Sequence, residues 1–123
     1  MKSILSLSLA FSVIVIGSTG CYYDVDEELN PELCDTTAMN YQKISAVFQQ
    51  GTCLSCHSGA NADAGLDLST YAGASQYLNS SSSTLIDRIT VGNTGAIMPP
   101  SGTKLNDCNV SKIRTWINAG FPQ

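Results

Sequence analysis

The chain has 123 residues, of which 43% are hydrophobic, and its formal net charge is −4. These values exclude a wholly disordered chain and argue against the basic footprint of a nucleic-acid-binding protein. The length allows one domain at most. The chain contains five cysteines and one histidine. An odd number of cysteines cannot form a complete set of disulfides, and one histidine excludes any site that needs two imidazoles from this chain.

Residues 1–20 have the pattern of a secretory signal peptide. Lys2 supplies a positive charge, residues 4–16 form an uncharged apolar run, and residues 17–20 are small. The apolar run of about 13 residues is too short to span a bilayer of roughly 30 Å as a helix. The pattern therefore predicts an exported protein. The alternative is a buried N-terminal helix of the folded core.

The junction at residues 17–21 resembles the lipoprotein signals of bacteria, in which a cysteine after small residues becomes the mature N-terminus and carries lipid. The resemblance implies that Cys21 is lipidated and anchors the protein to a bacterial membrane, on its periplasmic or cell-surface side. Ser18 departs from the usual motif, which has an aliphatic residue at this position. The alternative is ordinary cleavage nearby, which would leave Cys21 as an unpaired thiol.

The acidity of the chain belongs to residues 21–33, which we interpret as a solvated tether. This segment has few apolar residues and no helical period. Its acidic residues are Asp24, Asp26, Glu27, Glu28 and Glu32. Residues 34–123 contain five acidic and five basic side chains, so their formal charge is zero. We expect this part to form the single folded domain.

The apolar pattern of the domain predicts helices joined by long loops. Residues 40–50 carry apolar side chains at helical spacing, and Gly51 ends that helix. Ser69 or Thr70 caps a short helix that runs through Leu78. Residues 80–83 form a polar break, and residues 84–90 form another short helix. Residues 92–102 contain three glycines and two prolines, which predicts a loop.

The last predicted helix has the clearest signals. Asn106 is its N-cap, Asp107 favours its N-terminal dipole, and Gly120 ends it. Its apolar stripe consists of Val110, Ile113, Trp116 and Ile117. No segment shows a convincing alternation typical of strands, so the predicted fold class is all-α. A core of this size is marginal from burial alone.

Residues 53–57 read Cys-Leu-Ser-Cys-His, which is the attachment motif of c-type haem. The thiols of Cys53 and Cys56 are spaced so that each forms a thioether with one of the two vinyl groups of haem. The next residue, His57, is then placed under the iron and donates an imidazole nitrogen. The motif predicts one covalently bound haem c. Attachment outside the cytoplasm agrees with the signal peptide.

Two other interpretations of the cysteine pair remain. A thioredoxin-like redox pair belongs to a βαβ context, whereas no strand is predicted here. Zinc usually takes four ligands. The other candidates would be Cys34 and Cys108, with His57 as an adjacent further group.

Haem iron needs a second axial ligand unless its site is open. Because the chain has no second histidine, we expect methionine. Met98 lies 41 residues after His57, next to two prolines that stiffen its loop. Met39 is the alternative, although a core-filling role suits it better.

These motifs together resemble class I cytochrome c, and more narrowly the single-haem domains of planctomycete and Bacteroidetes proteins. The resemblance rests on the haem motif, on Gly-Leu-Asp-Leu at residues 65–68, on Met-Pro-Pro at residues 98–100 and on Trp-Ile-Asn-Ala-Gly at residues 116–120. It covers residues 34–123 and implies a small cytochrome c-like fold.

In that fold the first and last helices pack against each other beside the haem. Here these would be residues 41–50 and 107–119, with Phe48 and Trp116 as core candidates near the haem edge. Cys34 would lie just before the first helix and Cys108 in the first turn of the last. If the two helix starts come close, these cysteines can form a disulfide. It would close a loop of about 75 residues and could contribute roughly 4 kcal/mol.

The resemblance implies a membrane-anchored electron-transfer protein that is not an enzyme and exchanges electrons with redox partner proteins. An open-site haem sensor or small peroxidase-like enzyme is one alternative, but the chain has no second histidine for acid–base catalysis. A structural or partner-binding haem domain is another. Arg88 and Lys104 are candidate partners of the haem propionates.

Overall fold

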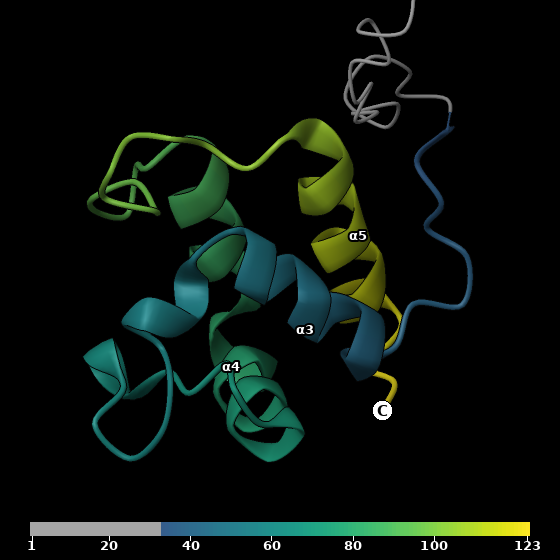
Figure 1. Cartoon of the computed structure of the whole chain (residues 1–123), viewed down its shortest axis with the longest axis horizontal. Helices are drawn as coiled ribbons and strands as arrows, with labels where there is room; N and C mark the ends of the chain where they lie inside the picture. The colour runs from purple at the N-terminus through teal and green to yellow at the C-terminus, as the bar shows by residue number, and fades with distance from the viewer. Residues whose placement is uncertain (1–32) are drawn as a thin grey trace, which may run out of the picture.

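The computed structural model describes residues 33–123, which form a small bundle of helices and loops (Figure 1). Its helices are α3 (Tyr41–Gln50), α4 (Tyr71–Thr90) and α5 (Asp107–Asn118), with the short 3-10 turns η3 (Cys53–Ser55) and η4 (Asp63–Gly65). No strand occurs among these residues, so the all-α prediction is confirmed. Within the same range, none of the helices combines the length and apolarity needed to cross a membrane. The predicted signal peptide, Cys21 and the tether up to residue 32 lie outside the described residues.

Each α-helix begins at a side chain that accepts a backbone N–H of the first turn. The caps are Asn40 of α3, Thr70 of α4 and Asn106 of α5, with acceptor distances of 3.0, 3.1 and 2.8 Å. Asn106 matches the prediction, and of the two candidates before α4 the cap is Thr70. At the other end of α3, Gly51 is the C-cap, but the left-handed residue is Thr52.

The predicted polar break at residues 80–83 is confirmed by a kink at Ser81, but the two short helices expected on either side of it join there into one element. The structure has one helix, α4, which is bent at Ser81 (φ −130°, ψ 16°). The hydroxyl of Ser80 donates to the carbonyl oxygen of Tyr77 at 3.3 Å, a local bond that is typical of bent helices. Leu78 and Ile89 lie on either side of the bend and are both buried in the core. Core packing therefore keeps both halves together, and the serines bend the helix without ending it.

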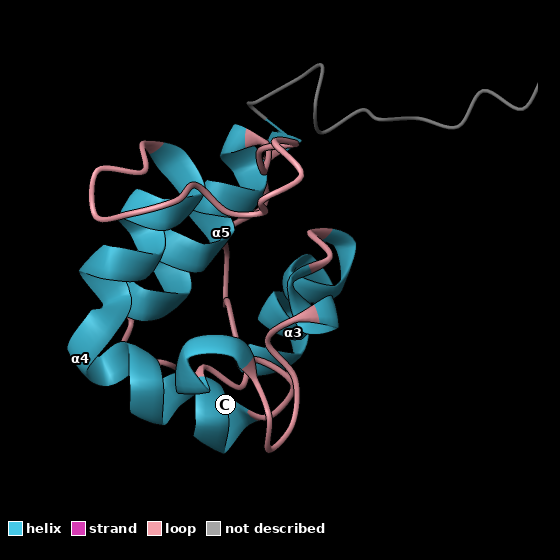
Figure 2. Cartoon of the chain, turned by 90° about the vertical axis from the view of Figure 1, so that its left-hand side faces the viewer, coloured by secondary structure: helices cyan, strands magenta, loops and turns pink. Residues whose placement is uncertain are grey.

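Helices α3 and α5 pack against each other, and α4 packs against α5 (Figures 1 and 2). Trp116 and Phe48 are 0% and 1% exposed, and their rings meet edge to face with centroids 6.4 Å apart. The indole N–H of Trp116 donates to the carbonyl oxygen of Pro122 at 2.8 Å. The backbone N–H of Tyr41 donates to the same oxygen at 2.9 Å. The C-terminal segment is thus tied to the start of α3.

Cys34 and Cys108 form a disulfide, with their Cα atoms 5.5 Å apart. It joins the segment before α3 to the first turn of α5, as the resemblance implied. The disulfide also removes both cysteines from the ligands that a zinc site at Cys53 and Cys56 would need.

Candidate functional site

The Cys-x-x-Cys-His motif folds into one tight turn directly after α3. Thr52 takes a left-handed backbone conformation (φ 58°), which is unfavourable for a β-branched residue and reverses the chain direction. The backbone N–H groups of Cys56 and His57 then donate to the carbonyl oxygen of Cys53, at 3.2 and 2.9 Å. The two thiols and the imidazole are therefore carried by a single hydrogen-bonded turn.

The ring of His57 is oriented by the loop that follows it. Its Nδ1 atom lies 3.1 Å from the backbone carbonyl oxygen of Asp63. That carbonyl can only accept, so Nδ1 is the donor in this bond, and in the neutral ring Nε2 then has the free lone pair that a metal-ligating histidine requires. Two backbone bonds hold the loop in place, from Asp63 N–H to the Cys56 carbonyl and from Leu68 N–H to the His57 carbonyl, both at 2.9 Å.

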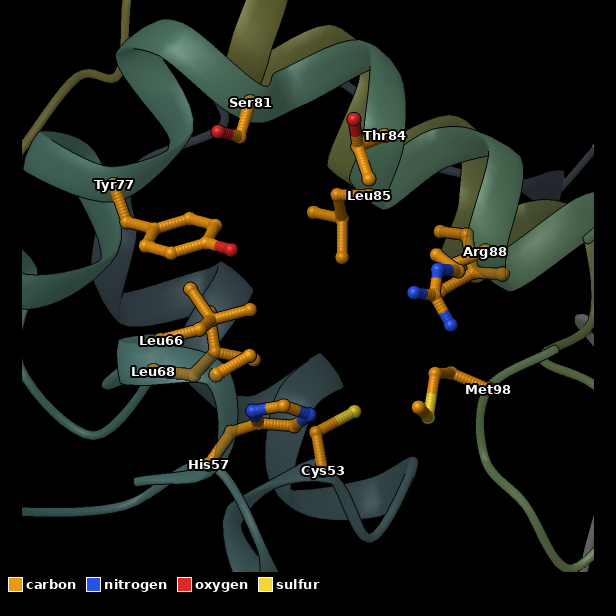
Figure 3. A pocket seen from close by; sticks show the side chains of 12 residues that line it. Cys53, His57, Leu66, Leu68, Tyr77, Ser81, Thr84, Leu85, Arg88 and Met98 are labelled. Carbon is orange, nitrogen blue, oxygen red and sulfur yellow. The ribbon is translucent and has the colours of Figure 1, made fainter. Parts of the chain in front are cut away.

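His57 and Cys53 face an apolar cavity (Figure 3). The cavity measures about 680 Å³, including some space open to solvent. Its lining residues are Cys53, His57, Ala64, Leu66, Leu68, Tyr77, Ser81, Thr84, Leu85, Arg88, Ile89 and Met98.

The two cysteines of the motif differ in exposure. Cys53 lines the cavity and is half-buried, whereas Cys56 is exposed on the outer side of the turn and does not line the cavity. Burial raises the pKa of the Cys53 thiol above its ordinary value. A thioredoxin-like redox pair needs a reactive thiolate with a lowered pKa. The environment of Cys53 therefore disfavours that interpretation.

The two candidate methionines are clearly separated in space. Met98 lines the same cavity as His57 and its side chain points into it (Figure 3). Met39 is 5% exposed, packs in the core and does not line the cavity. Of the two, only Met98 is placed to meet a group held by His57.

The two candidate cations for the propionates are also separated. Arg88 lines the cavity on the α4 side. Lys104 is exposed and lies at a different surface hollow, together with Gln50 and Asn106. Phe48 and Trp116 are buried core residues, as expected, but neither lines the cavity.

Sequence reasoning missed three polar residues of α4 that face the cavity: Tyr77, Ser81 and Thr84 (Figure 3). Together with Arg88 they follow helical spacing along one face, which is the signal that could have found them. The predicted break at residues 80–83 hid this periodicity, because it placed these side chains in different elements.

The residues around the cavity fit a covalently bound haem. The walls are mostly apolar, and the thiol of Cys53, the imidazole of His57 and the thioether sulfur of Met98 belong to side chains that line the one cavity. The second thiol of the turn, Cys56, is exposed and lies outside the lining residues. No group of three or more His, Cys, Asp or Glu side chains suited to an isolated metal ion occurs within residues 33–123.

Comparison with known proteins agrees with this fit. Residues 53–102 match the family model described as planctomycete cytochrome C. The curated proteins and the solved structures gave no match. The matched segment begins at the first cysteine of the haem motif and includes Met98. The match therefore supports a cytochrome c-like domain. Cytochromes c bind haem c covalently and use it for electron transfer.

Proposed function

We propose that this protein is an exported single-haem cytochrome that transfers electrons, with His57 and Met98 as the axial ligands of the haem iron. One observation carries the proposal: the sequence-distant His57 and Met98 line one apolar cavity together with Cys53. In this arrangement Cys53 and Cys56 form the thioethers to haem.

The bound haem would supply the redox couple, and the chain's own residues set its properties. The Nδ1 bond to the Asp63 carbonyl keeps Nε2 of His57 available and its ring orientation fixed. Aliphatic walls disfavour the additional positive charge of the oxidised state. A methionine ligand raises the reduction potential as well. Two fixed protein ligands keep structural change small during electron transfer and leave no open position for substrate. We therefore propose a carrier and not an enzyme.

The proposed partners are other redox proteins near a membrane. In this proposal, lipid on Cys21 anchors the chain and the acidic tether gives the domain reach. The formal charge of residues 34–123 is zero, so we expect recognition of partners to depend weakly on long-range electrostatic steering.

The first test is made on protein matured in a bacterial host that attaches c-type haem. Intact mass and a pyridine haemochrome spectrum should show one haem bound through two thioethers. An unmodified polypeptide mass would overturn the proposal.

The second test compares Met98→Leu with Met39→Leu as matched substitutions. We expect the weak long-wavelength band of ferric iron bound to a methionine sulfur in the wild-type protein. Met98→Leu should abolish this band, whereas Met39→Leu should keep it, because Met39 lies in the core. A wild-type protein that lacks the band and binds carbon monoxide readily when reduced would instead be an open-site haem protein.

A further inference from the structure

The last turn of α4 is bonded to the loop that carries Met98. This loop follows α4 directly, and its residues 93–96 are exposed. An exposed segment with no helix or strand of its own depends on specific hydrogen bonds for a fixed position. Two neighbouring residues of α4, Asp87 and Arg88, provide them.

Asp87 holds the first half of the loop. Its carboxylate oxygen Oδ2 accepts the backbone N–H of Thr94 at 2.6 Å and the Thr94 hydroxyl at 2.7 Å. Its backbone carbonyl accepts the N–H of Gly92 at 2.8 Å. The bonds from Thr94 hold the pKa of Asp87 below its ordinary value, so the carboxylate is charged and the bonds are charge-assisted.

Arg88 holds the second half of the loop and Met98 itself. Its guanidinium Nη1 donates to the carbonyl oxygen of Ala96 at 2.8 Å. Its backbone carbonyl accepts the N–H of Met98 at 2.7 Å. The guanidinium also packs so closely on Gly95 that a Cβ there would lie 2.5 Å from the Arg88 Cζ atom. Gly95 has φ 151°, a conformation that side chains rarely adopt.

We propose that Asp87 and Arg88 are positioning residues that fix Met98 for iron ligation. The inference rests on the proposed function, because it requires Met98 to be the axial ligand. Weakening these bonds would let Met98 leave the iron more often, so an external ligand would compete more effectively. This competition should be easiest to detect in the oxidised protein, because ferric iron binds nitrogen ligands well.

The experiment measures imidazole binding to the ferric, haem-loaded protein. Thr94→Val removes the hydroxyl bond to Asp87, and Gly95→Ala disturbs the packing against Arg88. The matched control is Thr37→Val, because the Thr37 hydroxyl and N–H contact the Asp35 carboxylate in the same way, at 2.5 and 2.8 Å. Neither Asp35 nor Thr37 lines the cavity.

We expect Thr94→Val and Gly95→Ala to strengthen imidazole binding by about tenfold, as loss of a charge-assisted bond implies. Their reduction potentials should shift, while Thr37→Val should change neither quantity. Thr94→Ser keeps a hydroxyl, so it should keep the weak imidazole binding that Thr94→Val loses. This comparison remains usable if Gly95→Ala fails to load haem.

The outcomes separate the two proposals. A wild-type protein without the sulfur-to-iron band would overturn the proposed function. A wild-type protein with that band, and Thr94→Val with unchanged imidazole affinity and potential, would overturn the positioning role alone.

Discussion

Asp67 connects the loop behind His57 to the beginning of α4. Its Oδ1 atom accepts the N–H of Gly59 at 3.0 Å and both the N–H and the hydroxyl of Ser69, at 2.9 and 2.6 Å. Its Oδ2 atom accepts the hydroxyl of Thr70 at 3.2 Å. These bonds, led by those from Ser69, lower the pKa of Asp67 from 3.8 to about 2. The charged carboxylate is therefore part of what orders the His57 loop.

This pKa predicts an acid-sensitive contribution of Asp67 to stability. A folded-state pKa below the unfolded value means that the contribution is fully present above pH 3.8 and is lost as the pH falls toward about 2. Asp67→Asn should lower the free energy of unfolding at neutral pH and flatten its decline across this window. Denaturant unfolding at a series of pH values measures both effects, with Asp63→Asn on the same loop as the control. An unchanged acid limb in Asp67→Asn would contradict the prediction.

Single residues of the site were predictable where their chemistry depends on local spacing. Cys53, Cys56 and His57 lie within five residues, and Met98 stands beside two prolines. The backbone carbonyl of Asp63 that orients His57 was not predictable, because any residue type can supply a carbonyl. Its position depends on the path of the loop, which includes a left-handed Ala64 (φ 57°) that propensity does not favour.

At the scale of elements, sequence signals located the helix ends and the kink of α4, but not the continuity of α4 across the kink. Asn106 caps α5 through its own side chain, a local interaction that sequence shows directly. The four consecutive serines at residues 80–83 indicated the position of the kink, but not that the helical segments on its two sides join directly. Serine has a weak helix propensity, but buried residues on both sides of the bend hold the two parts of α4 together through tertiary packing.

The first turn of α4 provides a test of how closely the preceding loop packs against it. A Cβ at Gly73 would lie 2.6 Å from the carbonyl oxygen of Asp67 and 2.9 Å from the Thr70 hydroxyl oxygen. Glycine to alanine within a helix ordinarily stabilises by about 0.5–1 kcal/mol. We expect Gly73→Ala to destabilise instead, by about 1–3 kcal/mol, because backbone must move to relieve the overlap.

Thermal or denaturant unfolding of the haem-loaded protein measures the sign of this effect. Ser83→Ala, at an exposed position of the same helix, is the control and should change stability by less than about 0.5 kcal/mol. A gain in stability from Gly73→Ala would show that the loop yields easily and is not closely packed.

At the scale of the whole molecule, α3 and α5 are joined at their ends by residues that do not themselves line the cavity. The disulfide between Cys34 and Cys108 joins the start of α5 to the segment before α3. Near the other end of α5, Trp116 shares the Pro122 carbonyl with the start of α3. None of these residues lines the cavity. The site lies beside this pair of helices and is formed by the haem-attachment turn, α4 and the loop that carries Met98.

We therefore expect the disulfide to contribute to global stability while having no direct contact with the site. It closes a loop across a sequence separation of 74 residues, for which the chain-entropy model gives about 4–5 kcal/mol. The double variant Cys34→Ala/Cys108→Ala should lose stability of this order in denaturant unfolding, and the reduced wild-type protein should behave alike. Under native conditions the folded double variant should keep the sulfur-to-iron band. Loss of that band would mean that the disulfide and the site are coupled. A stability loss below about 1 kcal/mol would mean that the unfolded chain is already constrained without the disulfide.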